Sequence, residues 1–298
     1  MSRAVTVGLD GSSESIAAAE WAAREASVLD RPLRLVHVWD AVPEAYPELA
    51  GADARRLWAE RARFDPRELV RRIRADRPEL SVETAQPCGD PVRVLCEAAD
   101  EAELLVLGSR GLGALTGFVV GSVSQSVVAR SRCPAVLVRA GQAQRESAAG
   151  SASGRPPGRV VVGVDAAQPC DEVMEYAFTR ADRHGAAVRA VYGWSLPVLW
   201  NPQPTAAVLA LRDEVAAAQQ ALVEEVLEPW RRKFPGVPAA AVAAEGRPAA
   251  ELPKAAEGAG LVVVGRRDRA AKPGPRIGSV THAVLHHCAA PVAVVPHG

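Results

Sequence analysis

Short, strongly hydrophobic runs alternate along this chain with longer segments that mix polar and apolar residues. Short apolar runs with few polar positions are typical of strands buried on both faces, and the longer mixed segments are typical of surface helices. In the first half, this pattern predicts strands at 4–9, 33–39, 80–85, 104–107 and 135–138, and helices at 13–29, 54–75, 91–101 and 122–130. The alternation indicates an α/β fold, with a five-stranded parallel sheet, right-handed crossovers and helices on both faces.

The same pattern occurs twice along the chain. Gly108 recurs 157 positions later as Gly265, and the strand that ends at Asp10 recurs as the strand that ends at Asp165. Between the repeats lies a segment of small, polar, proline- and glycine-bearing residues with no helix or strand period, which is typical of a flexible linker. We therefore predict a first domain at 1–140, a linker at 141–158 and a second domain at 159–298.

Proline positions refine the predicted helices. Asp90 followed by Pro91 is a favourable helix start, with aspartate as the N-cap and proline at the first helical position. In the second domain, a helix at 246–257 takes the place of the first domain's 91–101. A long helix at 206–234 contains Pro229, which is expected to end or kink it.

Composition narrows the class of protein. The chain has 298 residues, enough for two domains that each bury a core, and its 35 basic and 35 acidic residues balance. No long basic run is interleaved with aromatic residues, so we predict no nucleic-acid binding. Five scattered cysteines form no C-x-x-C pair, which indicates a reducing compartment. No signal peptide and no membrane-spanning stretch is recognisable, so we expect a soluble, cytoplasmic protein.

The most informative stretch follows the fourth predicted strand. Gly108, Gly111 and the pair Gly121-Ser122 come directly after a buried apolar run. Glycines at 108 and 111 allow positive backbone angles and close approach of main-chain N–H groups to an anion. The pair at 121–122 would begin a helix whose dipole favours negative charge. This loop therefore predicts a phosphate-binding site.

A second predicted element meets this loop. In a sheet ordered 3-2-1-4-5, Asp10 and Gly108 lie at the carboxyl ends of neighbouring strands, where ligands of open α/β sheets bind. Asp10, with Gly11 and Ser12, can offer a carboxylate to ribose, to adenine or to a nucleotide-bound Mg²⁺, and the backbone of Val38 can bond to adenine. The alternative is that Asp10 is an ordinary turn or N-cap residue ahead of the next helix.

With these residues in place, the chain resembles the universal stress proteins, in the tandem two-domain form and the ATP-binding branch. The stretch from Gly108 to Ser122 matches that branch's G-x2-G-x9-G-S/T signature. The resemblance implies ATP with Mg²⁺ as ligand, and a nucleotide-dependent regulator of stress response, dormancy or growth with little or no hydrolysis. The implied nucleotide-binding residues are Asp10, Gly11, Ser12, Val38, Gly108, Gly111, Gly121, Ser122, Val123 and Ser124.

The second domain departs from this pattern. Its corresponding residues are Asp165, Gly193, Gly265, Asp268, Gly278, Ser279 and Val280. Asp268 replaces the second glycine and puts a carboxylate where phosphate oxygens would lie, which opposes binding unless it is offset. Arginines in the same loop can pair with Asp268 or hold phosphate themselves, or they are solvated charges around a degenerate site. ATP binding is thus predicted for the first domain and left open for the second.

Other functions remain as alternatives. An enzyme that hydrolyses ATP or transfers from it in the same cleft would need an activated nucleophile or base, for which only Asp10 and Asp268 are candidates. No Walker motif or nucleophile elbow is recognisable. His282 and His286, four positions apart on one helix, suit a metal, but no third ligand is evident. A nucleotide-free, dimeric interaction protein is the remaining alternative.

The last strand of each repeat also suggests assembly. In the family resembled, this edge strand pairs between domains, which implies an intrachain pseudo-dimer and allows a further homodimer. The sequence does not identify the regulated protein partner.

Overall fold

The computed structural model describes residues 3–39, 64–109, 120–140, 158–195, 206–267 and 277–298. By its internal contacts the chain divides into two compact units, Met1–Ser153 and Gly154–Gly298. Nearly all of the predicted linker lies outside the described residues.

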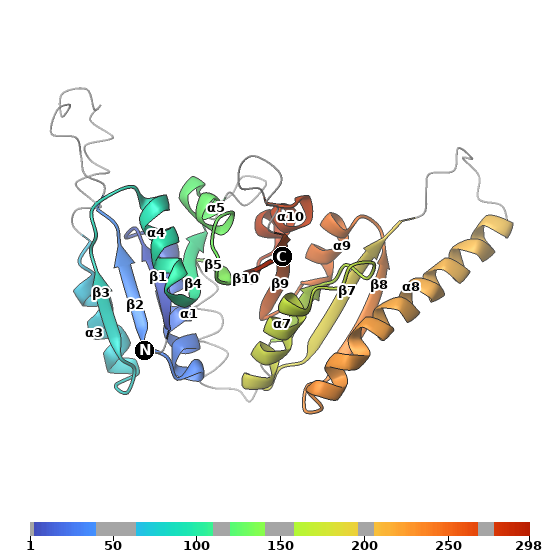
Figure 1. Cartoon of the computed structure of the whole chain (residues 1–298), viewed down its shortest axis with the longest axis horizontal. Coiled ribbons are helices and arrows are strands. Elements are labelled where there is room, and N and C mark those ends of the chain that lie inside the picture. The colour runs from blue at the N-terminus through green and yellow to red at the C-terminus, as the bar shows by residue number, and fades with distance from the viewer. Residues whose placement is uncertain (1–2, 40–63, 110–119, 141–157, 196–205, 268–276) are drawn as a thin grey trace, which may run out of the picture. The chain divides into compact units, whose positions relative to one another are not determined.

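Unit 1 is built on a five-stranded parallel sheet (Figure 1). Its strands are β1 (Ala4–Leu9), β2 (Leu33–His37), β3 (Val82–Ala85), β4 (Ala102–Ser109) and β5 (Ala135–Arg139), in the order β3-β2-β1-β4-β5. Every neighbouring pair is parallel. Strands β1, β4 and β5 are almost wholly buried, as their largely apolar sequences predict, whereas edge strand β3 exposes Glu83 and Thr84. The predicted α/β class with a parallel sheet is confirmed.

Helices cover both faces of this sheet. They are α1 (Ser13–Leu29), α3 (Pro66–Asp76), α4 (Pro91–Asp100) and α5 (Ser122–Val128). Helices α1 and α3 contact each other on one face, and α4 and α5 contact each other on the other face. The side of α1 that meets the sheet is rich in buried alanines, which let its backbone come close to the strands. At α4, the Asp90 carboxylate accepts the N–H of Arg93 at 2.8 Å, the N-cap predicted from sequence.

Unit 2 repeats the architecture. Its strands are β6 (Val160–Gly163), β7 (Val188–Trp194), β8 (Ala239–Glu245), β9 (Leu261–Arg267) and β10 (Val292–His297), in the order β8-β7-β6-β9-β10. Its helices are α7 (Asp171–Arg183), α8 (Ala206–Lys233), α9 (Pro248–Ala255) and α10 (Ser279–His287). Helices α7 and α8 contact one face of the sheet, and α9 packs with α10 on the other.

Several element boundaries differ from the prediction, and three of these bear on the candidate site. Strand β2 ends at His37, and Trp39 forms only an isolated bridge to Cys88. Strand β4 is longer than predicted and includes Gly108. Only the part of the predicted helix 54–75 that lies beyond residue 63 is described, and there the helix begins at Pro66.

The sequence predicts a helix at 206–234 that Pro229 ends or kinks; α8 does not end at Pro229 but continues to Lys233. Aromatic packing accounts for this, because the ring of Trp230 stacks on Phe178 at 5.8 Å and on Phe234 at 6.4 Å. Phe178 is fully buried. Stacking of Trp230 and Phe234 on the buried Phe178 ring offsets the backbone hydrogen bond that proline cannot donate.

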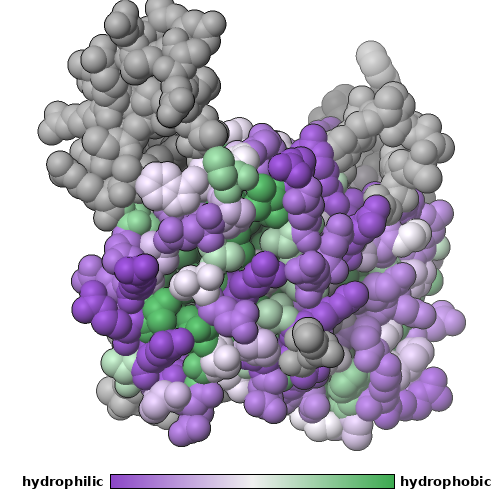
Figure 2. Space-filling model, turned by 60° about the vertical axis from the view of Figure 1, so that its left-hand side comes forward, coloured by the Kyte–Doolittle hydropathy of each residue, from purple (hydrophilic) through white to green (hydrophobic). Residues whose placement is uncertain are grey.

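No helix in the described ranges is long and apolar enough to cross a membrane. On the face seen in Figure 2, hydrophilic residues predominate among the described atoms, and hydrophobic residues lie in small separate groups.

Candidate functional site

A tight turn follows β1 in unit 1. The Asp10 carboxylate accepts hydrogen bonds from the backbone N–H of Ser12, at 3.0 Å, and from the Ser12 hydroxyl. Gly11 has φ +80°, the left-handed region that favours glycine, and a Cβ there would lie 3.0 Å from the Cβ of Phe64. The alternative role considered for Asp10, a turn residue, is therefore present in the fold.

Ser12 caps helix α1. Its hydroxyl accepts the N–H of Ser15 at 3.2 Å, and the Ser15 hydroxyl donates to the Ser12 carbonyl at 2.9 Å. The turn and the cap hold the Asp10 carboxylate beside the first turn of α1, at the carboxyl edge of the sheet. A ligand at this edge would meet a carboxylate and the positive end of a helix dipole together.

The expectation for Gly108 needs a correction. Gly108 lies within β4 and is not among the described residues with a positive φ. Its role is close packing, because a Cβ there would lie 2.7 Å from the backbone carbon of Glu14 and from the nitrogen of Ser15. Only glycine lets the first turn of α1 rest directly on this strand.

Helix α5 begins at Ser122, as predicted, and Gly121 is its N-cap with φ −60°. Among the described residues, no side chain caps this helix and no heavy atom lies within 4 Å of a Cβ built on Gly121. Ser122 and Val123 are exposed. The first N–H groups of α5 thus have no side-chain cap from the part of the chain that the structure describes.

Ser124 ties α5 to the sheet. Its hydroxyl donates to the carbonyl of Gly108 at 2.9 Å, so its proton is already used within the fold. In unit 2, Thr281 makes the same bond to the carbonyl of Gly265, also at 2.9 Å. Sequence reasoning overlooked Thr281, although it lies 157 positions after Ser124, like the glycines of the repeat.

An aromatic group lies at the carboxyl end of β2. The His37 ring lies 5.8 Å from that of Trp39 and 5.4 Å from that of Phe64. Trp39 is 41% exposed, and its backbone bonds to Pro87 and Gly89 hold it in place. Val38, whose backbone is the predicted adenine contact, lies between His37 and Trp39. Phe64 was not predicted, because the apolar pattern there indicated only a helix.

Gly111 falls in segment 110–119 and Asp268 in segment 268–276, both outside the described residues. Of the predicted residues near each loop, the structure therefore describes only those before and after it. In each unit a hydrogen bond joins the two sides of the loop, from Ser124 to Gly108 and from Thr281 to Gly265.

In unit 2 the corresponding glycine packs against different groups. Asp165 makes the same kind of turn as Asp10, accepting the N–H of Ala167 at 3.1 Å. A Cβ at Gly265, however, would meet the His297 imidazole at 2.8 Å and a methyl group of Val173 at 3.1 Å, where unit 1 has helix backbone. Gly193 is required by packing, since a Cβ there would lie 2.6 Å from the Cα of Pro248 at the start of α9. Like Gly121, Gly278 has no described heavy atom within 4 Å of a Cβ built on it, and a helix begins after it at Ser279 and Val280.

A cavity of about 400 Å³ lies at the start of α7. Its lining residues are Gln168, Pro169, Cys170, Asp171, Glu172, Arg267, His297 and Gly298. Arg267 donates to Gln168 at 2.8 Å, and the Cys170 thiol donates to Glu172 at 3.2 Å. Burial raises the pKa of Cys170 to about 11, so the thiol stays protonated and is a poor nucleophile near neutral pH. A bond to its own backbone N–H, together with the Cys170 thiol, lowers the pKa of Glu172.

The histidine pair of α10 is formed as the spacing predicts. The rings of His282 and His286 stack with centroids 4.3 Å apart. Desolvation, then the neighbouring charges of His286 and His287, lower the pKa of His282. No group of three metal-ligating side chains occurs among the described residues.

Two α/β units, each with a parallel sheet and its candidate residues at the carboxyl ends of the strands, define a tandem Rossmann-like protein. A family model described as the universal stress protein family matches residues 1–139 and 157–296. The chain belongs to the universal stress protein family.

Known relatives resemble it over nearly the full length. A universal stress protein of Mycobacterium tuberculosis (strain H37Rv) is 33% identical over 299 residues, covering 97% of this chain and 96% of that protein. One of Mycolicibacterium smegmatis is 32% identical over 302 residues, covering 98% and 96%. The crystal structure of a universal stress protein from Archaeoglobus fulgidus matches with a TM-score of 0.67 at 20% identity, covering 99% and 98%, which supports the fold.

Proposed function

We propose that unit 1 binds ATP with Mg²⁺ and that the protein is a cytoplasmic, nucleotide-dependent regulator in stress response, dormancy or growth control. The proposed site comprises the Asp10 turn, the backbone at Val38, the loop from Gly108 to Gly121 and the first turn of α5. Membership of the universal stress protein family supports the stress-related role.

The observation that carries this proposal is the position of Gly108. Its backbone packs against the first turn of α1 and accepts the hydroxyl proton of Ser124 in the first turn of α5. The amino-terminal ends of two helices therefore approach one glycine at the carboxyl edge of the sheet. Both helix dipoles favour an anion there, and no described side chain bonds to the first N–H groups of α5.

Unit 2 is proposed to bind nucleotide weakly or not at all. The imidazole of His297 and the side chain of Val173 lie against Gly265. The carboxylate of Asp268 in the sequence adds a like charge to that loop. The two units would then have different roles, because unit 1 would bind ATP and unit 2 would stay in its nucleotide-free state.

A charge placed at Gly121 tests the proposal. Aspartate is a favourable N-cap and the space before Gly121 is open, so Gly121→Asp should fold normally. Its carboxylate would face the phosphates and weaken binding of Mg²⁺–ATP by roughly tenfold or more, measured by titration calorimetry. Mass spectrometry of ligand released from the denatured wild-type protein should identify adenine nucleotide.

Two matched variants control this experiment. Gly121→Asn has nearly the same shape without charge and should bind ATP as the wild type does. Gly278→Asp places the same charge at the corresponding position of unit 2 and should leave binding unchanged. Absence of binding heat in the wild-type protein would refute the proposal. If Gly121→Asn loses as much ATP affinity as Gly121→Asp, the added charge is not the cause of the loss. Continuous phosphate release from ATP would favour the enzyme alternative.

A further inference from the structure

The outer edge of the unit 2 sheet is formed by β8. The carbonyl of Pro238, just before this strand, accepts the N–H of Val188 at 2.8 Å and therefore points toward β7. Backbone groups alternate in direction along a parallel strand. The N–H and carbonyl groups of Ala239, Ala241 and Ala243 therefore point away from the sheet, where a further strand would pair.

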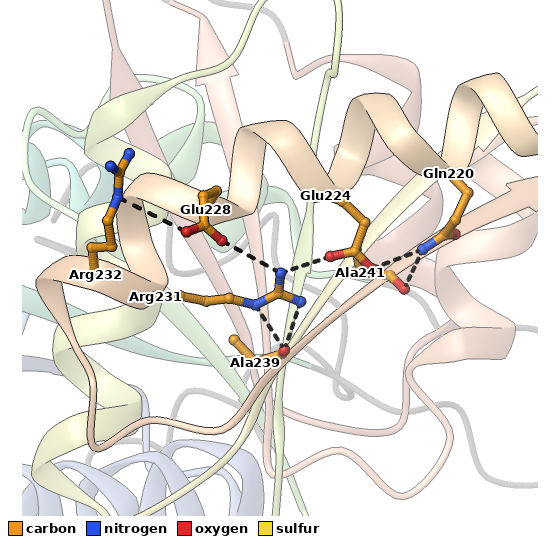
Figure 3. Close-up of polar contacts among 7 residues, drawn as sticks. All are labelled: Gln220, Glu224, Glu228, Arg231, Arg232, Ala239 and Ala241. Atoms are coloured by element: carbon orange, nitrogen blue, oxygen red, sulfur yellow. Dashed lines mark hydrogen bonds and ion pairs between the residues drawn. The ribbon is translucent and has the colours of Figure 1, made fainter.

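Side chains of α8 occupy these outward groups. The Gln220 amide donates to the carbonyl of Ala241 at 3.0 Å (Figure 3). It also accepts the N–H of Ala243 at 2.9 Å, so it bonds to the strand as a neighbouring strand would do. Arg231 donates through Nη2 to the carbonyl of Ala239 at 3.0 Å, and through Nε at 3.3 Å. Three successive outward-facing residues of β8 are thus bonded to one helix.

The guanidinium of Arg231 is held in this position by acidic residues of its own helix. Its Nη1 lies 2.7 Å from a carboxylate oxygen of Glu224 and 3.9 Å from one of Glu228 (Figure 3). Glu224 also accepts the Gln220 amide at 3.2 Å. The two side chains that reach β8 are therefore linked through one carboxylate.

Unit 1 repeats the arginine contact. On α3, Arg74 donates to the carbonyl of Val82, the first residue of edge strand β3, at 2.9 Å. Arg74 precedes Arg231 by the same 157 positions that separate Val82 from Ala239. The carbonyl of Ser81 accepts the N–H of Leu33, so Val82 too faces outward. The same device occurs at the outer strand of both units.

We propose that α8 covers the outer edge of β8 and blocks strand pairing there. In this proposal, Gln220 and Arg231 take the place of a neighbouring strand and prevent two copies of the chain from pairing through this edge. A sheet edge with open N–H and carbonyl groups is a template for another strand, and natural proteins cover or charge such edges. Helix α8 is then a device against self-association, separate from the proposed nucleotide site.

The sequence of β8 indicates that the strand most able to pair with this edge is β8 of a second copy of the chain. From Ala239 to Ala244 it has no charge, proline or glycine, so two copies could pair without repulsion. Strand β3 is shorter, with 4 residues against 7, and carries Glu83. The longer edge, whose charged residue Glu245 is at its end, thus has more bonds to a covering helix.

A double variant, Gln220→Ala with Arg231→Ala, tests the proposal in the full-length protein. Sedimentation velocity across a wide concentration series should show larger species for the double variant than for the wild type. Adding Ala243→Pro should abolish this association, because the outward N–H of Ala243 is lost and edge strands tolerate proline at such positions. If the double variant keeps the wild-type mass throughout, or still associates with Ala243→Pro, the proposal is wrong.

The neighbouring residues provide a matched control. Gln219→Ala with Arg232→Ala removes the same two residue types from the same helix, but neither side chain has a described bond to β8. This control should behave as the wild type, and equal association would overturn the proposal. Should the double variant unfold, the single variant Gln220→Ala is decisive. Hydrogen exchange at the Ala243 amide should then be roughly three- to tenfold faster, with no change in Gln219→Ala.

Discussion

At the scale of single residues, one glycine position serves two kinds of packing. Gly108 meets the backbone of α1, which cannot move without displacing a helix. Gly265 in the second unit meets the imidazole of His297, which can rotate away, and a methyl group of Val173. The motif predicts both glycines, but only the three-dimensional contacts explain why each is needed.

Replacement of these glycines by alanine should therefore have unequal effects. We expect Gly108→Ala to lower the free energy of unfolding by about 1–3 kcal/mol, because the new methyl group would overlap backbone atoms. Gly265→Ala should cost less than about 1 kcal/mol, since side chains can adjust. Urea unfolding followed by circular dichroism compares the two, and an equal loss would show that His297 is held rigidly.

At the scale of helices and strands, the apolar pattern predicts which elements form better than where they end. Strand β1 and helix α1 match the prediction fully, because Ser12 is a recognisable N-cap and the strand is uniformly apolar. The persistence of α8 through Pro229 depends on stacking with Phe178, a residue distant in the sequence. Local propensity contains no information about such contacts.

The N-caps of the corresponding helices α1 and α7 differ between the two units. Helix α1 is capped by Ser12, whereas the N-cap of α7 is Cys170, which makes no side-chain cap bond. Cys170 has the extended backbone of an N-cap, with φ −121° and ψ 112°. Cys170→Ser should therefore stabilise the protein by about 0.5–1 kcal/mol, measured as a rise in melting temperature. Cys170→Ala is the control and should give no gain.

At the scale of the whole molecule, duplication made the fold predictable. Each repeat contains the same order of strands and helices, so the parallel sheet with two covered faces could be inferred twice. The candidate site could be predicted only in part. Asp10 and Gly108 lie at the same edge of the sheet because the sheet order makes β1 and β4 neighbours, but the packing of His297 against Gly265 involves the end of a different strand, β10.

Each unit should then fold and act by itself. Fragments 1–153 and 154–298 each retain a complete five-stranded sheet and a buried core, and domains of this size bury enough surface to be stable. Both fragments should unfold cooperatively on heating, followed by circular dichroism. Calorimetry should show Mg²⁺–ATP binding to fragment 1–153 and none to 154–298, with Gly121→Asp abolishing binding in the first. Equal binding by both fragments would show that His297 and Asp268 do not close the second site, and loss of cooperative unfolding would show that neither unit is an independent domain.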